Sequence, residues 1–313
     1  MLSKTSITAS VGHNAINKPV DVALIQDLLS RAGYLVAVNG IYDETMLARI
    51  RGFQSKNGFL RPDGVVSPHG PTLAKLLKNA GKFYTGPDYW RENPSVEWWN
   101  TASRVFTGRF AQQFPNAARV VNWTIPRPAG LATVFTSICK DPHVMDLRWA
   151  AYMMATCQRE CPGFVPIAEY GKGAGMPYGK PENFKATNGK TYTNTYYGRG
   201  YVQLTWGENY LKLGKAIGMG ETLAEHPDDA LKPDIAYKIM SYGMRKGAFT
   251  GRKLGDFIQG TTCDYYNART IINGHDHAEG IADCAVQIEG ILRLGIPPEG
   301  APVRHQLPAV IWV

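Results

Sequence analysis

The chain has 313 residues, a formal net charge of +8 and a pI near 9.1. Its hydrophobic content of 44% excludes a disordered protein, and no apolar run approaches the ~20 residues that span a bilayer. The first twenty residues contain no apolar segment before a small-residue cleavage site, so no secretory signal is predicted. The positive charge indicates an anionic partner, with nucleic acid, acidic membrane and cell-wall polymer all open.

The positive charge is spread evenly along the chain. Residues 1–80 carry 9 of the 34 basic and 5 of the 26 acidic side chains, which is half of the net charge. The densest basic stretch contains Arg245, Lys246, Arg252 and Lys253, and it is interrupted by glycine and phenylalanine. Because nucleic-acid binders concentrate basic residues on one element, no nucleic-acid partner is predicted.

The five cysteines do not indicate a disulfide framework. Their number is odd and no secretory signal precedes them. Cys157 and Cys161 share a helix face, but no second CxxC or HxxxH pair accompanies them to complete a zinc site. We therefore expect small buried thiols and neither a metal nor an organic cofactor.

Residues 1–80 are predicted to form a small three-helix module. Apolar residues recur at helical spacing between Val22 and Leu29, with Asp21 as the expected helix cap. A second helix follows Asp43, and a third carries leucines between Leu73 and Leu77. About sixty residues bury only a small core, so a module of this size is expected to bind rather than to catalyse.

Two turn-plus-helix units within this module resemble each other. Asn39-Gly40 precedes the second helix, and Asp63-Gly64 precedes the third. Together with the pairs Ile25-Gln26 and Phe53-Gln54, these turns make the segment similar to the three-helix type of peptidoglycan-binding domain. The resemblance implies a module that binds the cell wall.

The remainder is predicted to be a second, mainly helical domain, with residues 81–94 as linker, 95–296 as domain and 297–313 as tail. Glycine and proline interrupt the linker. The segment 161–209 is rich in glycine, proline and threonine, and loops of that length are usually functional. The predicted helices are Val96–Phe106, Leu131–Ile138, Leu147–Glu160, Tyr210–Ile217, Asp234–Arg245, Leu254–Ile258, Tyr265–Ile272 and Ala278–Arg293.

Two carboxylates suggest acid/base chemistry. Glu160 continues the apolar face of the helix 147–160 into its last turn, where burial and the helix dipole should raise its pKa. A protonated carboxyl group of this kind suits a general acid, although an exposed Glu160 paired with Arg159 is equally consistent with the spacing. Glu169 follows in the loop, where it can stay ionised as a base. Contrasting carboxylates are typical of glycoside hydrolysis.

The run Tyr196–Trp206 is dense in aromatic and β-forming residues and contains two glycines. We expect a turn into a short strand, with Gln203 and Thr205 on one face and Val202 and Leu204 on the other. This arrangement would present an amide and a hydroxyl group to a polar ligand. A half-buried strand with a polar outer face is the structural alternative.

The same run closely resembles the signature of family 19 glycoside hydrolases, the chitinase-like lysozymes. The segments 146–153, 169–173 and 268–274 fit the same family. Joined to a wall-binding module, the chain resembles a modular bacteriophage endolysin with a lysozyme-like α-helical domain and a minor β element. Around the acid, many relatives have His-Glu-Thr where this chain has Arg159-Glu160-Cys161.

The resemblance implies specific roles by position. Glu160 matches the catalytic acid, Glu169 the base of an inverting reaction, and Thr205 the hydroxyl group that helps to hold the attacking water. Such a pair is separated by roughly 6.5–9.5 Å. The positions that match substrate-binding or cleft-lining residues are Tyr197, Arg199, Gln203, Asn209 and Asn273.

The expected function is hydrolysis of the β-1,4 bond between N-acetylmuramic acid and N-acetylglucosamine by a monomer that does not insert into membranes. As for an endolysin, we expect accumulation in the host bacterial cytoplasm and release to the periplasmic wall through a separate pore-forming protein. Three alternatives stay open: a chitinase, a non-enzymatic wall-binding protein, and a metal-dependent wall peptidase using His275-Asp276-His277.

Overall fold

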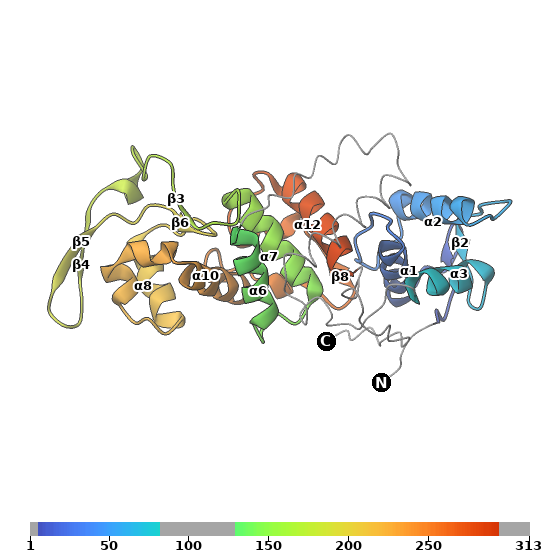
Figure 1. Ribbon diagram of the computed structural model, residues 1–313, viewed down its shortest axis with the longest axis horizontal. Coiled ribbons are helices and arrows are strands. Elements are labelled where there is room, and N and C mark those ends of the chain that lie inside the picture. The colour runs from blue at the N-terminus through green and yellow to red at the C-terminus, as the bar shows by residue number, and fades with distance from the viewer. Residues whose placement is uncertain (1–5, 82–128, 294–313) are drawn as a thin grey trace. The chain divides into compact units, whose positions relative to one another are not determined.

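The computed structural model describes residues 6–81 and 129–293 (Figure 1). Helices predominate and the sheets are short and two-stranded, which confirms the predicted mainly α fold class. The described residues form two compact units, one of 6–81, 258–264 and 283–293, the other of 129–257 and 265–282. The predicted helix Val96–Phe106, the tail 297–313 and all of the expected linker except residue 81 lie outside the described residues.

The N-terminal part of the first unit contains the three predicted helices, α1 (Pro19–Arg31), α2 (Glu44–Lys56) and α3 (Pro71–Gly81). β1 (Val11–Gly12) pairs antiparallel with β2 (Val65–Val66). The helices enclose a core of fully buried apolar side chains, which includes Val22, Ile25, Leu29, Met46, Ile50, Phe53, Leu73 and Leu76. Burial of this apolar surface is the main stabilising term for a module of this size.

The N-terminal end of α2 lies where the sequence predicted it, whereas that of α1 does not. Asp43 is the N-cap of α2, as expected, and its carboxylate accepts a hydrogen bond from Met46 N at 2.7 Å. The expectation that Asp21 caps α1 is wrong, because α1 begins earlier, at Pro19. Asp21 is buried inside the first turn, where Oδ2 accepts from Thr8 Oγ1 and Ala9 N.

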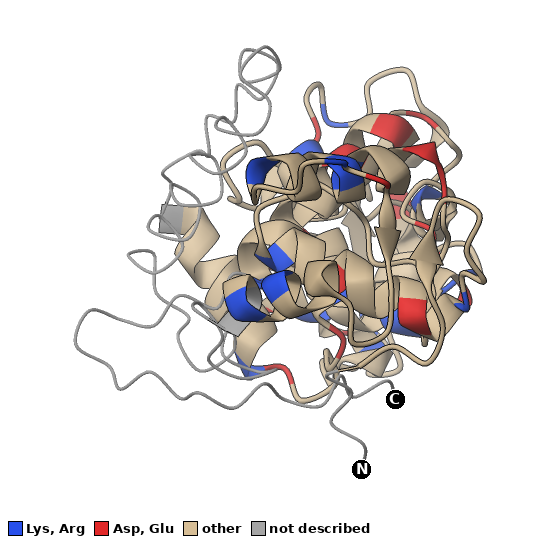
Figure 2. Ribbon diagram, turned by 90° about the vertical axis from the view of Figure 1, so that its right-hand side faces the viewer, with Lys and Arg blue, Asp and Glu red and all other residues tan. Residues whose placement is uncertain are grey.

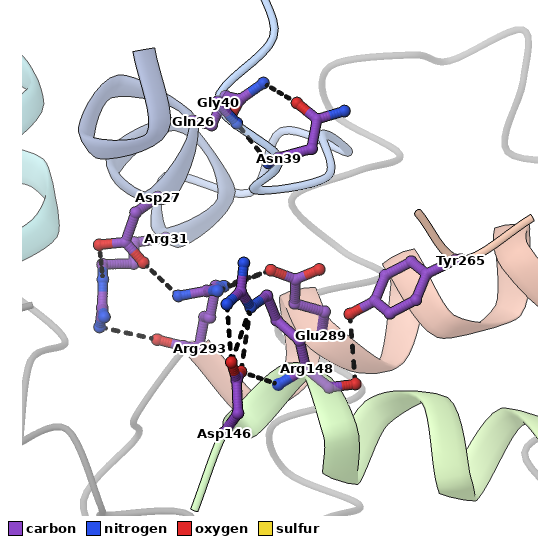
Figure 3. Close-up of polar contacts among 10 residues, drawn as sticks. All are labelled: Gln26, Asp27, Arg31, Asn39, Gly40, Asp146, Arg148, Tyr265, Glu289 and Arg293. Atoms are coloured by element: carbon purple, nitrogen blue, oxygen red, sulfur yellow. Dashed lines mark hydrogen bonds and ion pairs between the residues drawn. The ribbon is translucent and has the colours of Figure 1, made fainter. Parts of the chain in front are cut away.

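Each of the two turns of the internal half-repeat is held by a buried glutamine from the helix that precedes the turn. Gln26 Oε1 accepts from the backbone N–H of Gly40 at 2.8 Å, and Gln54 Oε1 accepts from that of Gly64 at the same distance. The Gln26 amide also donates to Asn39 Oδ1, as the Gln54 amide does to Asp63 Oδ1 (Figure 3 shows the first of these two clamps). Each glutamine thus satisfies the polar groups of the turn that it clamps.

Segments far along the chain complete the first unit. They are the hairpin of β7 (Ile258–Gln259) with β8 (Thr262–Cys263), and the C-terminal part of α12 (Ala278–Arg293). Arg293 pairs with Asp27 at 2.6 Å and with Glu289 at 2.7 Å, and Asp27 also accepts from Arg31 (Figure 3). This four-residue network, the clasp, ties α12 to α1.

The second unit contains the predicted helices between Ala129 and Phe257 together with irregular structure. Figure 1 shows α7 beside α6, and the β4–β5 hairpin near α8. The predicted helix at 265–272 is a 3-10 helix, η3 (Asn267–Ile271). The other elements are α6 (Ala129–Lys140), α7 (Leu147–Glu160), β3 (Ile167–Ala168), η1 (Pro177–Gly179), β4 (Glu182–Lys185), β5 (Thr191–Asn194), β6 (Arg199–Gly200), α8 (Gly207–Ala216), α9 (Thr222–Glu225), η2 (Pro227–Leu231), α10 (Pro233–Lys246) and α11 (Leu254–Phe257).

Basic and acidic residues are interspersed along the ribbon (Figure 2), in agreement with the even spread of charge along the sequence. Within the described ranges, no helix combines the length and the hydropathy that a membrane span requires.

The substitution Asp27→Asn should destabilise the first unit, and the size of this loss should depend on pH. Burial raises the pKa of Asp27, but Arg31 and Arg293 outweigh burial and hold that pKa below its ordinary value. A lowered folded-state pKa stabilises the fold above the unfolded value of about 4, and the contribution is lost as pH falls through the folded value. We expect Asp27→Asn to lower the melting temperature by about 5–10 °C at pH 7, and this gap to close below about pH 4.

Thermal unfolding between pH 7 and pH 3 measures both effects. The control is Asp234→Asn, which changes an exposed carboxylate in the first turn of α10. A melting temperature of Asp27→Asn equal to that of the wild type at pH 7 would contradict a stabilising role for the clasp.

Candidate active site

Glu160 is the last residue of α7, at the position predicted from the sequence. Asp146 caps the start of this helix by accepting from Arg148 N, and an almost continuous buried stretch follows from Ala150 to Cys157. The helix ends at Cys161, whose N–H still bonds to Cys157 O. The Glu160 side chain is 18% exposed. A buried helix therefore carries a carboxylate to the surface of the unit at its C-terminal end.

The partner of Glu160 is Arg269, from η3. Arg269 Nη1 lies 2.7 Å from Glu160 Oε1, and the Arg269 side chain is only 3% exposed. Its Nε also donates to the backbone oxygen of Asp276, which fixes the guanidinium. Arg159, the neighbour considered in the sequence, is exposed, and the structure gives it no ion pair with Glu160. The ion pair holds Oε1, and Oε2 has no hydrogen-bond partner among the described residues.

Glu169 is held by two neutral donors. The Tyr178 hydroxyl donates to Oε1 at 2.9 Å, and the backbone N–H of Gly198 donates to Oε2 at 3.0 Å. The backbone N–H of Glu169 donates in return to Gly198 O at 2.7 Å. Burial and the bond to Glu169 raise the pKa of Tyr178, so the phenol stays a hydrogen-bond donor. The carboxylate is thereby oriented without a cation.

One short backbone segment, residues 198–200, forms hydrogen bonds near both carboxylates. Cys161, which follows Glu160, donates its thiol to Gly200 O at 3.0 Å, while Glu169 is bonded to Gly198. β3 and β6 pair antiparallel between these points. Residues two apart on an extended strand are separated by about 7 Å. The structure therefore anchors the two carboxylate-bearing segments to one stretch of three residues.

Glycines allow the loop after Glu169 to fold back on itself. A Cβ atom on Gly179 would lie 2.0 Å from Gly173 O, a backbone contact that no side chain permits. Gly173 has a φ of +71°, which favours glycine. Because the loop closes this tightly, Tyr178 reaches the carboxylate nine residues before it. Tyr178 was not among the residues predicted from the sequence, although the glycines of this loop were a usable signal.

The signature segment forms a tight turn, and the expected strand through Leu204 is wrong. β6 ends at Gly200, and Leu204 bonds back to Arg199 through both backbone groups. Gln203 adopts a φ of +50°, and its amide donates to the backbone oxygens of Ile167 and Gly200. The predicted alternation is still seen in the exposure of the side chains, because Val202 is buried whereas Gln203 is half-buried.

Thr205 and Asn209 lie at the start of α8, and both are half-buried. The Asn209 amide donates to the backbone oxygen of Thr205 at 2.9 Å, which leaves the Asn209 side-chain oxygen and the Thr205 hydroxyl group without a hydrogen bond within the described chain. Both groups are therefore placed to meet a polar ligand. Their predicted roles remain predictions.

Tyr197 and Arg199, expected to line the cleft, are instead buried inside the unit. Arg199 is 3% exposed, and its guanidinium stacks on the Tyr197 ring with 3.6 Å to the ring centroid. It also pairs with Asp228 and donates to Tyr210 Oη. This side chain cross-links the signature segment to η2 and α8, so its contacts are structural.

Asn273 and the histidine motif lie on the exposed loop between η3 and α12. The Asn273 side chain accepts from Gly274 N, and His275 bonds to Asn267 Oδ1. In the part of the chain that the structure covers, no three His, Cys, Asp or Glu side chains gather as metal ligands would. Cys157 and Cys161 are free thiols, and burial raises the pKa of Cys161 to about 12, as expected for a structural thiol.

Comparison with known proteins identifies the N-terminal part of the first unit. Residues 18–76 match the family model described as "Putative peptidoglycan binding domain". The match covers all of α1 and α2 and most of α3, as well as both glutamine clamps. The chain thus contains a peptidoglycan-binding domain, and peptidoglycan is its indicated partner. No curated protein and no solved structure gave a match.

Removal of the Arg269 guanidinium should weaken the second unit, because it leaves Glu160 without its charge partner. We expect Arg269→Met to lower the free energy of unfolding by about 2 kcal/mol, a value reduced for the partial exposure of Glu160. Arg159→Met is the matched control, since it removes an exposed arginine next to the same carboxylate. Equal losses in both variants, measured by urea unfolding, would contradict the assignment of Arg269 as the partner.

Proposed function

We propose that the chain is a cell-wall hydrolase that cuts the β-1,4 bond between N-acetylmuramic acid and N-acetylglucosamine in peptidoglycan. The observation that carries the proposal is that the segments bearing the two carboxylates are anchored to the same three residues, 198–200. Glu160 is held by one buried cation, whereas Glu169 is held by a phenol and a backbone N–H. A peptidoglycan-binding domain on the same chain supports the substrate class.

In the proposed reaction, Glu160 and Glu169 act on opposite sides of the glycosidic carbon. Glu160 gives a proton from Oε2 to the glycosidic oxygen, so that the bond from this oxygen to C1 breaks. Glu169 takes a proton from a water molecule, whose oxygen forms the new bond to C1. Arg269 orients the first carboxyl group through Oε1, and Thr205 assists in holding the water.

The net charge supports weak, general attraction to the wall. The charge of +8 is divided equally between residues 1–80 and the rest, so both parts of the chain favour an anionic polymer. This attraction is screened by salt and carries no information about the bond that is cut. Specificity is expected from polar side chains such as Gln203, Asn209 and Asn273.

Mass spectrometry of digested peptidoglycan tests the proposal. The wild type should release fragments with new N-acetylmuramic acid reducing ends, whereas Glu160→Gln and Glu169→Gln should each lose activity by at least about 100-fold. Glu208→Gln, an exposed carboxylate in the first turn of α8, is the matched control and should retain activity. Cleaved cross-links with intact glycan would mean a peptidase, and activity on chitin alone would mean a chitinase.

The stereochemistry of the product tests the role of Glu169 separately. If Glu169 activates water rather than attacking C1 itself, the β-linkage is inverted and the fresh product is the α-anomer. Proton NMR during the first minutes of digestion, before the anomers equilibrate, distinguishes the two forms. A β-anomer as first product would mean a retaining reaction and would overturn the proposed mechanism.

A further inference from the structure

Trp206 is an exposed aromatic side chain in a strained backbone conformation. It is 47% exposed and follows directly after Thr205. Its φ of 70° and ψ of 130° lie in a region that residues other than glycine rarely adopt. The backbone is fixed there, because Trp206 N donates to Tyr196 O, and Trp206 O accepts from Asn209 N and Tyr210 N. Strain that the surroundings impose in this way is typical of functional positions.

The Trp206 ring contacts the residue that holds Glu169. The rings of Trp206 and Tyr178 form an edge-to-face pair, with centroids 5.5 Å apart and an angle of 75° between the planes. The Tyr178 hydroxyl is bonded to Glu169 Oε1 at 2.9 Å. The two rings therefore stand nearly perpendicular to each other beside the carboxylate, and we refer to this pair as the aromatic platform.

A platform of this kind suits a sugar ring. The C–H groups of a pyranose face are apolar and slightly positive, and they are attracted to the negative face of an aromatic ring. Covering the exposed part of Trp206 also removes apolar surface from water. A glycan offers one such face in every residue.

We propose that Trp206 and Tyr178 bind one pyranose ring of the glycan next to Glu169, and that Tyr178 is a positioning residue for Glu169. The inference rests on the proposed function, because it assumes a glycan substrate, and it adds a binding role for Trp206 and Tyr178 that the family resemblance did not assign. Trp206 acts on affinity, whereas Tyr178 has two separable parts, a ring and a hydroxyl group.

Fluorine NMR of the chain labelled with 5-fluorotryptophan tests the binding directly. The full chain with Glu160→Gln is titrated with a hexamer of N-acetylglucosamine and with peptidoglycan glycan strands. The Trp206 resonance is the one missing from a spectrum of the additional variant Trp206→Phe. We expect this resonance to shift saturably with at least one of the two glycans. A resonance that neither glycan moves would overturn the platform.

Kinetics of the otherwise wild-type chain on soluble glycan strands separate the two residues. Trp206→Gly should raise KM about tenfold with kcat within about threefold, since a lost stacking contact weakens binding. Its melting temperature should stay within a few degrees, because glycine accepts this φ. Tyr178→Phe keeps the ring and should instead lower kcat about tenfold and move the acidic limb of its pH profile, with KM within about threefold.

The control for the loss of an aromatic pair is Tyr192→Ala, which breaks the edge-to-face contact of Tyr192 with His226 and touches neither carboxylate. It should leave KM unchanged. An unchanged KM in Trp206→Gly would overturn the binding role, and an unchanged kcat in Tyr178→Phe would overturn the positioning role. If the Trp206 resonance shifts while wild-type chain cuts no glycan, the platform stands and the proposed hydrolysis fails.

Discussion

The candidate site depends on the close approach of the backbone at Gly198–Gly200 to its neighbours. A Cβ atom on Gly198 would lie 3.2 Å from the Glu169 side chain and 3.0 Å from Gln203 Oε1. Gly200 has a φ of +82°, and a Cβ atom there would lie 2.8 Å from Ala230 O. Two glycines thus let one strand bond to Glu169 at one end and to Cys161 at the other. This backbone holds Glu169 directly and the C-terminal end of α7 through Cys161. A side chain at Gly198 would crowd Glu169, and one at Gly200 would clash with Ala230 O.

The helices were predictable because they depend on local patterns. The predicted ranges Leu147–Glu160 and Ala278–Arg293 coincide with α7 and α12. Apolar periodicity marks such helices along their length, and stop signals such as Pro162-Gly163 mark their ends. The same approach placed Asp21 wrongly, because an acidic residue in a first turn resembles a cap when its distant partners, Thr8 and Ala9, are not known.

The partners of the candidate site residues were not predictable, because they come from distant segments. Arg269 lies 109 residues from Glu160 along the chain, and Arg293 lies 266 residues from Asp27. No periodicity connects such pairs. A sequence gives only an indirect signal of such a pair, namely a charged residue within an otherwise buried segment. Arg269 sits between Ala268 and Ile271, both fully buried, so a guanidinium there required a buried acceptor.

The most specific motif of the sequence describes a scaffold more than a set of ligand contacts. Arg199, at its centre, is buried under Tyr197 and bonded to Asp228, and Gln203 uses its amide to close the turn. The identities of these residues are strictly constrained, because each buried polar group needs a hydrogen-bond partner at a suitable distance. A residue that meets solvent on one side, such as Trp206, is under weaker structural constraint, so its identity carries more information about a ligand. Contact residues are therefore best sought among the exposed positions of the motif and its neighbours, where exposure and backbone strain coincide.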